Sequence, residues 1–488
     1  MPDDELAPTG IAGLDEILRG GLPPHQMHLV QGDPGAGKTT LSFQFLLEGV
    51  RRGEKTLYVT LSASERDLQR VARSHGWDIG AIDIYEQFRN AASAETTVFR
   101  PAEVELAKTV QAILGAIEER QPDRVVIDSL GEIRLLAESA LRYRKQLLTL
   151  KEFFRDRRVT ALVLDDRAAS SKEAEVQGLA EGVIRLSVSA PMYGNTRRSL
   201  EVVKMRGVGF RGGCHDFAIE KGGIVVFPRL SAGQHLVNRQ EGVIPSGVAE
   251  IDALVGGGLE RGSATMVMGP AGVGKSSLAM QFAVSAAAAG DRVSFFIFEE
   301  HQTVFLKRAA SLGFDLEPAL AAGCLSVQQI DPAEMSAGEF AYAVRTAVET
   351  QGSSMIIIDS LNGYFNAMPE EHFLTLHLHE LLSYLTDAAV TTIVIVSQHG
   401  ALGQVSSPVD VSYLADAVIL LRYFETRGAF GRAISMLKKR TSAHEQTVRE
   451  YRLTSRGVSV GPVLEEFRGI LSGMQSSEAP AVKPEPKP

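Results

Sequence analysis

The sequence has few cysteines, no long apolar run and no excess of basic residues. Its 488 residues include only two cysteines, Cys214 and Cys324, which form no C-x-x-C pair. We therefore expect both to be buried small hydrophobic residues in a reducing compartment. No run of about 18 apolar residues exists, so no membrane-spanning helix is expected. The first residues are polar and acidic, unlike a signal peptide, which makes the cytoplasm the expected location.

Two segments match G-x-x-x-x-G-K-[ST], the P-loop pattern. The first is Gly32, Asp33, Pro34, Gly35, Ala36, Gly37, Lys38 and Thr39, followed by Thr40, and the second is Gly269, Pro270, Ala271, Gly272, Val273, Gly274, Lys275 and Ser276, followed by Ser277. Glycines let such a loop wrap so that its N–H groups point at phosphate oxygens, and the following helix adds its positive N-terminal end. We expect Lys38 and Lys275 to reach the β- and γ-phosphates of ATP. The hydroxyls of Thr39 and Ser276 are expected to bind Mg²⁺.

The sequence around each P-loop has the pattern that the motif requires. An apolar, strand-like run precedes each loop, at residues 27–30 and 265–268, and an apolar helical pattern follows, at residues 41–47 and 278–284. This context makes a chance glycine-rich turn a poor explanation. No N-K-x-D guanine signature is present, so ATP is favoured over GTP.

The two halves of the chain repeat each other. Lys38 and Lys275 lie 237 positions apart. The same offset relates Pro8-Thr9-Gly10 to Pro245-Ser246-Gly247, Asp15 to Asp252 and Gly21 to Gly258. A repeat of this length is a whole domain, so we predict domains at residues 1–235 and 236–473. Residues 474–488 are rich in Pro, Ser and Glu and are expected to form a disordered tail.

Short apolar runs alternate with helical patterns in both halves. The runs that we expect to form strands are residues 55–61, 124–129 and 160–165 in the first half and residues 292–298, 354–360 and 391–398 in the second. Nearly continuous apolar strands between helices indicate a mainly parallel sheet that helices cover on both faces. The predicted fold class is therefore α/β, with one such sheet in each domain.

Carboxylates at strand ends suggest how ATP would be hydrolysed. Asp128 and Asp359 end apolar strands after their P-loops, which is the Walker-B arrangement for holding Mg²⁺. In the second domain Glu299 and Glu300 follow the second strand, and a carboxylate there can orient and deprotonate water. In the first domain the same offset leads to Ser62-Ala63, and neither residue can act as a base. We expect both domains to bind ATP and the second to be much better equipped to hydrolyse it.

Several motifs together resemble the KaiC family, two-domain relatives of the RecA-like ATPases. They are the opening P-T-G-I-x-G-L-D at residues 8–15, the two P-loops, Phe298-Glu299-Glu300, the aspartate-ended strands, Lys204-Met205-Arg206-Gly207, and residues 422–428. The resemblance spans residues 8–473. It implies two tandem RecA-like domains, each forming one layer of a hexameric double ring, with ATP bound between neighbouring subunits.

The resemblance also implies which cations reach the neighbour's nucleotide. In the family the K-M-R-G motif places a lysine and an arginine on the γ-phosphate of the next subunit. Here these residues are Lys204 and Arg206 in the first domain. In the second they are Lys438 and Arg440, with Lys439 in the methionine position. Such cations would neutralise charge that develops on the transferred phosphoryl group. A solvated basic turn is the alternative.

Members of this family phosphorylate themselves on an adjacent Ser-Thr pair in the second domain. The corresponding place here reads Ser412-Tyr413. Tyrosine is longer than threonine, so its hydroxyl should overshoot a site shaped for a short side chain. The resemblance therefore implies serine/threonine kinase activity toward the chain itself, with Ser412 as the one phosphoacceptor. In the family a clock partner binds the C-terminal peptide. The tail after residue 473 is short here, so it offers such a partner little to bind.

The sequence thus predicts a homohexameric Mg-ATPase that acts as a nucleotide-dependent signalling or clock-like regulator, with signalling proteins as partners. One alternative is a RecA-like DNA-repair or recombination ATPase. The net charge of −9 and the absence of basic runs count against nucleic acid as a partner. They do not exclude a local basic channel that binds it. The other alternative is a scaffold that holds ATP with little turnover. Ser62 and Ala63 favour it for the first domain, while Glu299 and Glu300 oppose it for the second.

Overall fold

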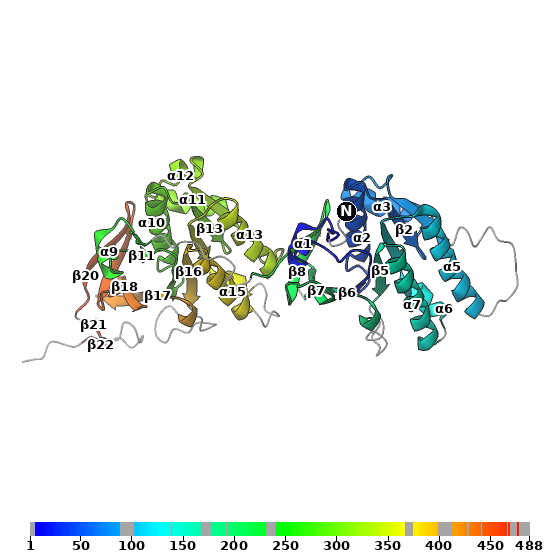
Figure 1. Cartoon of the computed structure of the whole chain (residues 1–488). Helices are drawn as coiled ribbons and strands as arrows, with labels where there is room; N and C mark the ends of the chain where they lie inside the picture. The colour runs from blue at the N-terminus through cyan, green and yellow to red at the C-terminus, as the bar shows by residue number, and fades with distance from the viewer. Residues whose placement is uncertain are drawn as a thin grey trace, which may run out of the picture. The chain divides into compact units, whose positions relative to one another are not determined.

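The computed structural model describes residues 5–87, 102–137, 139–166, 177–191, 194–230, 241–366, 374–398, 412–426, 429–440, 442–465, 467–468 and 476–477. The chain divides into two compact units, Met1–Arg229 and Leu230–Pro488, each built on one nine-stranded sheet (Figure 1). The predicted boundary, between residues 235 and 236, lies outside the described residues.

The first unit is organised around β1, which leads into the first P-loop. Its strands are β1 (Met27–Gly32), β2 (Thr56–Thr60), β3 (Asp83–Glu86), β4 (Arg124–Asp128), β5 (Thr160–Asp166), β6 (Gly182–Ser189), β7 (Arg197–Met205), β8 (Cys214–Glu220) and β9 (Gly223–Phe227), and its helices are α1 (Ala12–Ile17), α2 (Lys38–Arg51), α3 (Glu65–His75), α5 (Ala102–Arg120), α6 (Leu130–Leu136) and α7 (Ala140–Asp156). The strand order is β3-β2-β4-β5-β1-β6-β7-β8-β9. Strands β3 to β6 in this order are parallel, and β6 to β9 pair antiparallel.

Helices cover both faces of this sheet. Successive residues of a strand point to opposite faces, so both must be apolar when both faces are covered. In β1, Leu29 belongs to the core that α5, α6 and α7 close, whereas Val30 belongs to the core that α1, α2 and α3 close. The residues of β1 are buried throughout because alternate residues pack into two separate cores, one on each face of the sheet.

The second unit has the same plan. Its strands are β10 (Val243–Ile244), β11 (Leu259–Glu260), β12 (Ala264–Pro270), β13 (Val293–Ile297), β14 (Leu325–Gln329), β15 (Met355–Asp359), β16 (Thr391–Gln398), β17 (Ala417–Thr426), β18 (Ala429–Lys439), β19 (Val448–Thr454), β20 (Gly457–Val463), β21 (Phe467–Arg468) and β22 (Ser476–Ser477), and its helices are α9 (Ala249–Leu254), α10 (Lys275–Ala288), α11 (Gln302–Ser311), α12 (Glu317–Ala321), α13 (Ala337–Glu349), α14 (Leu361–Asn366), α15 (Leu374–Asp387) and the 3-10 helix η1 (Ser412–Leu414). The main sheet has the order β14-β13-β15-β16-β12-β17-β18-β19-β20, which repeats that of the first unit. β10-β11 and β21-β22 form small separate pairs.

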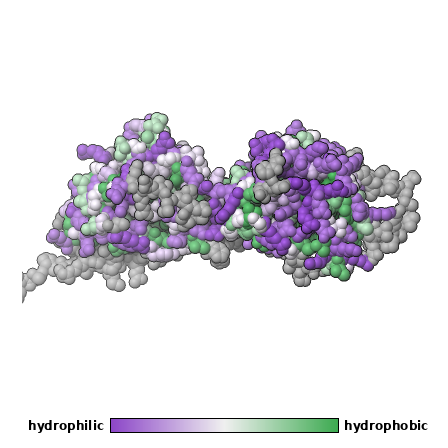
Figure 2. Space-filling view, in the orientation of Figure 1, coloured by the Kyte–Doolittle hydropathy of each residue, from purple (hydrophilic) through white to green (hydrophobic). Residues whose placement is uncertain are grey.

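The predicted fold class is confirmed, and two details differ from expectation. The strands that complete the antiparallel part of each sheet, β7 to β9 and β18 to β20, were not among the predicted strands, and neither was β6. The prediction that both cysteines are buried is wrong, because Cys214 is exposed on β8 and Cys324 is half-buried; both are free thiols. No helix in the described part of the chain is long and apolar enough to cross a bilayer. The visible face of each unit is mainly hydrophilic, with small separate hydrophobic areas (Figure 2).

Candidate nucleotide-binding sites

The second P-loop joins the end of β12 to the start of α10. Gly272 and Gly274 have φ angles of 74° and 105°, in the left-handed region that glycine adopts readily. A larger residue would not fit at Gly274, because its Cβ would lie 2.8 Å from a ring carbon of Tyr451. The Tyr451 hydroxyl donates a 2.9 Å hydrogen bond to the carbonyl oxygen of Gly274 and so fixes the loop where α10 begins.

A cavity of about 500 Å³ opens beside this loop. Its lining consists of Gly272, Gly274, Lys275, Ser276, Ser277, Glu299, Glu300, Arg308, Ser311, Leu312, Asp359 and Leu453. Strands β12, β13 and β15 all end here, so the cavity lies at the C-terminal edge of the parallel strands, where open α/β sheets bind ligands. The fold thus brings together the phosphate-binding, metal-binding and base residues that the sequence predicts for the second domain.

The two adjacent glutamates of this cavity make different contacts. The hydroxyl of Ser360 donates a 2.5 Å hydrogen bond to Oε1 of Glu299. Glu300 instead forms an ion pair with the guanidinium of Arg308 on α11. A carboxylate engaged by a guanidinium is poorly placed to turn toward water, whereas Glu299 keeps Oε2 without a partner among the described residues. The geometry therefore favours Glu299 over Glu300 as the group that orients water.

Asp359 and Ser276 form the candidate metal site of the second domain. Loss of solvent in the crevice raises the pKa of Asp359 to about 6, and a hydrogen bond from the Ser276 hydroxyl acts against this rise. A hydroxyl and a carboxylate that face each other are oxygen ligands of the kind that Mg²⁺ prefers. The residues present therefore fit Mg²⁺. The ammonium of Lys275 lies at the same crevice and donates a 2.9 Å hydrogen bond to the carbonyl oxygen of Pro270.

The first P-loop has the same backbone form. Gly35 and Gly37 have φ angles of 79° and 100°. A Cβ at Gly37 would lie 2.9 Å from a methyl carbon of Ile219, so the loop packs closely against the antiparallel half of the sheet. This close approach explains why glycine is needed before α2 begins.

Asp128 of the first domain has a partner that the second domain lacks. The hydroxyl of Tyr58 on β2 donates a 2.5 Å hydrogen bond to Oδ2 of Asp128. Burial raises the pKa of Asp128, and hydrogen bonds from Tyr58 and Thr39 act against this rise. At the position of Tyr58 the second domain has Phe295, 237 residues later. The Thr39 hydroxyl and the Asp128 carboxylate again form an oxygen pair that fits Mg²⁺.

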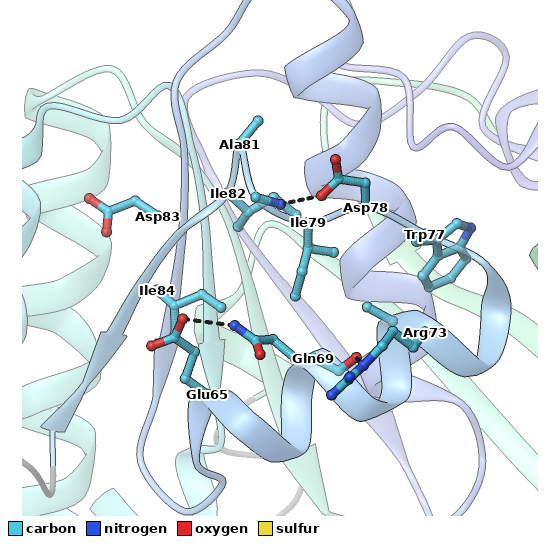
Figure 3. A pocket seen from close by; sticks show the side chains of 12 residues that line it. Glu65, Gln69, Arg73, Trp77, Asp78, Ile79, Ala81, Ile82, Asp83 and Ile84 are labelled. Atoms are coloured by element: carbon cyan, nitrogen blue, oxygen red, sulfur yellow. Dashed lines mark hydrogen bonds between the residues drawn. The ribbon is translucent and has the colours of Figure 1, made fainter.

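Among the described residues of the first domain, no carboxylate follows β2 at the place that Glu299 has after β13. Ser62 and Ala63 follow β2, where the Thr60 hydroxyl donates to the carbonyl oxygen of Ala63 at 2.7 Å and accepts from its N–H at 3.0 Å. Glu65 begins α3 and accepts a 3.1 Å hydrogen bond from Gln69 (Figure 3). Both side chains line a cavity of about 690 Å³ between α3 and the segment before β3, and no P-loop residue lines it. The expected asymmetry between the two domains remains a prediction, and the geometry agrees with it.

Lys204 and Arg206 lie at the opposite edge of the sheet from the first P-loop. Met205, between them, pairs with Gly182 at the start of β6, and Gly182 is level with His28 near the start of β1. The P-loop follows the end of β1, so on the order of 15 Å of strand separates these cations from it. They cannot reach the nucleotide bound by their own domain.

The two cations have local partners at this edge. The ammonium of Lys204 donates a 2.6 Å hydrogen bond to the carbonyl oxygen of Gln177. Arg206 forms a 3.1 Å ion pair with Glu181 and is more than half exposed. Loss of solvent and the charge of Arg206 lower the pKa of Lys204. Both side chains are therefore held at the surface by weak contacts that a phosphate could replace.

The second domain places its cations in the same way. Lys438 pairs with Val418 near the start of β17, which is level with the start of β12. Its ammonium donates a 2.9 Å hydrogen bond to the carbonyl oxygen of Ala415. Arg440 donates a 2.9 Å hydrogen bond to the carbonyl oxygen of Tyr413. Neither cation can reach the cavity beside the second P-loop of its own chain.

The candidate phosphoacceptor lies beside these cations. Ser412 begins η1, just before β17, at the edge opposite the second P-loop. Its side chain lies outside the described residues. The side chain of Tyr413 is 56% exposed. The second P-loop of the same chain is therefore too far away to deliver a phosphoryl group to this segment.

Sequence reasoning missed three residues at the two sites. Ser360 follows Asp359 directly and could have been found as a polar residue at a strand end beside the P-loop. Arg308 and Asp166 lie on other elements, so only the fold shows that they reach the sites. Asp166 ends β5 and forms a 2.8 Å ion pair with Lys38.

Two wrapped P-loops, each at the C-terminal ends of the parallel strands of its sheet and beside a strand-end aspartate, define a protein with two tandem P-loop nucleotide-binding domains. The family model for the KaiC ATPase matches residues 7–231 and 244–465. The chain therefore belongs to the KaiC ATPase family, as the resemblance predicted, and its two domains are tandem RecA-like ATP-binding domains.

Curated relatives match over nearly the whole chain. The circadian clock protein KaiC3 of a Synechocystis species is 28% identical over 477 residues, which are 96% of this chain and 94% of the relative. The circadian clock oscillator protein KaiC of Parathermosynechococcus lividus is 29% identical over 95% of this chain and 87% of its own length. The KaiC of Synechococcus elongatus is 28% identical over 95% of this chain and 91% of its own length.

Proposed function

We propose that this chain binds ATP in both domains and hydrolyses Mg-ATP mainly in the second. The observation that supports this most directly is the placement of Glu299. It lies in the cavity beside Lys275 and Asp359, with a neutral serine hydroxyl on one carboxylate oxygen. The first domain has Ser62 and Ala63 at the corresponding point. Hydrolysis requires a group that orients water and takes its proton, and only the second site provides a carboxylate there.

In this proposal the residues of the second site have separate roles. The N–H groups of the P-loop and the Lys275 ammonium hold the β- and γ-phosphates. Ser276 and Asp359 hold Mg²⁺, which when bound offsets negative charge on the phosphates. Glu299 orients the attacking water and accepts its proton. Water is thereby aimed at the γ-phosphate while the phosphate itself is held still.

The remaining charge is offset by a neighbouring subunit. Lys438 and Arg440 lie across the sheet from their own P-loop, so they serve only a nucleotide of another copy of the chain. Lys204 and Arg206 have the same position in the first domain. Each domain would then form a closed ring with ATP between subunits, and the family resemblance gives six as the number of copies. A ring in which each site is completed by the next subunit is a heterologous, closing assembly.

We further propose that Ser412 accepts phosphate from the neighbour's second site and that the protein acts as a nucleotide-dependent signalling or clock-like regulator in the cytoplasm, with other proteins as partners. The names of its relatives, which describe clock proteins, support the regulatory part. For the first domain alone, a nucleotide-holding scaffold role is favoured by the absence of a carboxylate at Ser62 and Ala63.

Phosphate release by three single variants tests the proposal. Lys38→Ala should retain most of the ATPase activity, because it damages only the first site. Lys275→Ala and Glu299→Gln should each lose nearly all of it. Glu299→Gln should still bind ATP, since the lysine and the metal residues remain, and this separates a lost base from lost binding. The proposal fails if Glu299→Gln hydrolyses ATP at close to the parental rate.

A further inference from the structure

The lysine of the first P-loop is already occupied by a carboxylate. The Lys38 ammonium donates hydrogen bonds to the carbonyl oxygens of Gly32 at 2.7 Å and Asp33 at 3.1 Å. Its third contact is the 2.8 Å ion pair with Oδ1 of Asp166. An ammonium has three N–H donors, so all three are in use. A phosphate that binds Lys38 must therefore replace one of these partners.

The second domain has no carboxylate at this place. In the first sheet Asp166 pairs with Gly32, and in the second sheet Ser397 pairs with Gly269, so Ser397 occupies the position of Asp166. Within the described residues, Lys275 makes one hydrogen bond, to Pro270, and no ion pair. The second lysine is accordingly open to phosphate where the first is not.

The residue that faces this position also differs between the two domains. Asn362 of α14 accepts a 2.7 Å hydrogen bond from the N–H of Ser397 and donates one of 2.8 Å to its carbonyl oxygen. At the corresponding point of the first domain stands Gly131, where a Cβ would lie 4.0 Å from Oδ2 of Asp166. Gly131 thus leaves room for the carboxylate of Asp166, while the second domain fills this space with a neutral amide.

We propose that Asp166 sets the nucleotide preference of the first site by occupying, on Lys38, the place that a γ-phosphate would take, so that this site favours a nucleoside diphosphate over a triphosphate more than the second site does. The inference rests on the proposed nucleotide binding in the first domain. A diphosphate can bind the loop while the pair between Asp166 and Lys38 persists. A triphosphate must take the ammonium from Asp166 and then lies beside an unpaired carboxylate.

The size of the effect follows from charge and exposure. The side chain of Asp166 is 56% exposed, so water and salt screen its repulsion of the γ-phosphate. We expect it to weaken binding of the triphosphate by about tenfold relative to the diphosphate. Occupancy of the first site by ATP would then depend on the ratio of ATP to ADP, even though this site lacks a base for hydrolysis.

Nucleotide binding to the full chain tests this inference. In a Lys275→Ala background, which leaves the first site as the one under study, fluorescent ATP and ADP analogues are titrated with Mg²⁺. Asp166→Ser, which installs the residue of the second domain, and the isosteric Asp166→Asn should both tighten ATP by about tenfold and change ADP by less than about twofold. Asp156→Asn is the matched control, because this exposed aspartate of α7 loses the same charge away from Lys38. It should leave both affinities unchanged.

The reciprocal change provides an independent check. In a Lys38→Ala background, Ser397→Asp should weaken ATP at the second site by about tenfold relative to ADP. An unchanged ratio of ATP to ADP affinity in both Asp166 variants overturns the inference, as does weaker ATP binding, which would show that Asp166 supports the triphosphate. Failure of the Lys275→Ala parent to bind either nucleotide would instead remove the proposed nucleotide site of the first domain, and the inference with it.

Discussion

Ser360 and Glu299 are joined by a 2.5 Å hydrogen bond, although 61 residues separate them. Ser360 directly follows Asp359, the acid at the end of β15, while Glu299 follows β13, the next strand in the sheet. The hydroxyl therefore ties the candidate base to the strand that holds the candidate metal ligand. It joins the two strand ends without adding a charge, and Oε2 of Glu299 has no other partner among the described residues.

The first prediction concerns the difference between the two glutamates. Glu299→Gln should lower the rate of ATP hydrolysis by about 100-fold, as expected for a positioned base. Glu300→Gln should lower it far less, because the carboxylate of Glu300 is already engaged by the guanidinium of Arg308. Steady-state phosphate release at saturating Mg-ATP measures both. Equal losses in the two variants would show that the contact with Arg308 does not divide their roles.

The second prediction concerns cations supplied between subunits. The Arg440→Ala variant keeps the base Glu299 but no longer supplies a guanidinium to the neighbour's nucleotide. The Glu299→Gln variant keeps this guanidinium but lacks the base. Each variant alone should be nearly inactive. When the two variants are mixed in equal amounts and their subunits exchange, about a quarter of the sites should combine Glu299 of one subunit with Arg440 of the next. Activity should return in proportion. A mixture of Glu299→Gln with Lys275→Ala is the control, since both lesions lie on the same side of the site. Absence of recovery in the first mixture would argue against sharing of sites.

Much of the site could be predicted from the sequence because its chemistry is local. The glycines and the lysine of each P-loop lie within eight consecutive positions, and this spacing alone predicts a phosphate-binding loop. The parallel strands could also be predicted, since strands buried on both faces are continuously apolar. The β6 to β9 half could not, because its strands alternate between buried and half-exposed residues and are separated by glycine-rich turns.

The contacts that distinguish residues within each site could not be predicted. Glu299 and Glu300 make different contacts because Arg308 of α11 pairs with Glu300 alone. The ion pair of Lys38 with Asp166 joins residues 128 positions apart, through the pairing of β1 with β5. Pairing across strands depends on the order of the sheet, which a single sequence does not specify. Such contacts decide how two P-loops of the same pattern differ.

The third prediction concerns acid stability of the first domain. His28 on β1 is fully buried, and burial lowers its pKa to about 4, although its ring shares a 2.8 Å hydrogen bond with the carbonyl oxygen of Pro23. The unfolded chain has a normal histidine pKa near 6.5 and binds the proton more readily than the native state. The free energy of unfolding therefore has its full value above about pH 6.5. It decreases by on the order of 3 kcal/mol as the pH falls toward 4.

Trp77 makes this loss measurable in one domain, because it is the single tryptophan and packs against Phe43 in the first core. Urea midpoints followed by its fluorescence should fall from pH 6.5 to pH 4.5. In His28→Gln the pH dependence should be weaker. His25→Gln, at a half-exposed histidine of the same domain, is the control and should keep the parental pH dependence. If the urea midpoint of His28→Gln falls with pH as steeply as that of the parent, groups other than His28 cause the loss of stability in acid.

The last prediction concerns phosphate on Ser412. The segment begins η1 at the end of the strands opposite its own P-loop, so we expect the phosphoryl group to come from the second site of a neighbouring subunit. Transfer requires the serine oxygen in line with the γ-phosphate and a base for its proton, and we expect Glu299 of the neighbour to serve both water and serine. Tyr413 is exposed and longer than threonine, so phosphate should appear on Ser412 alone and at low stoichiometry.

Mixed subunits test the direction of this transfer. Asp359→Asn, which should lack its own activity, is mixed with an excess of Ser412→Ala, which lacks the acceptor, and incubated with Mg-ATP. Phosphopeptide mapping should find phosphate on Ser412 of the Asp359→Asn chains, because an active neighbour supplies it. Each variant incubated alone should give no signal at this position. Hydrolysis of ATP in the mixture without phosphate on Ser412 would mean that the neighbouring site delivers its phosphoryl group to water and that the chain is an ATPase without kinase activity.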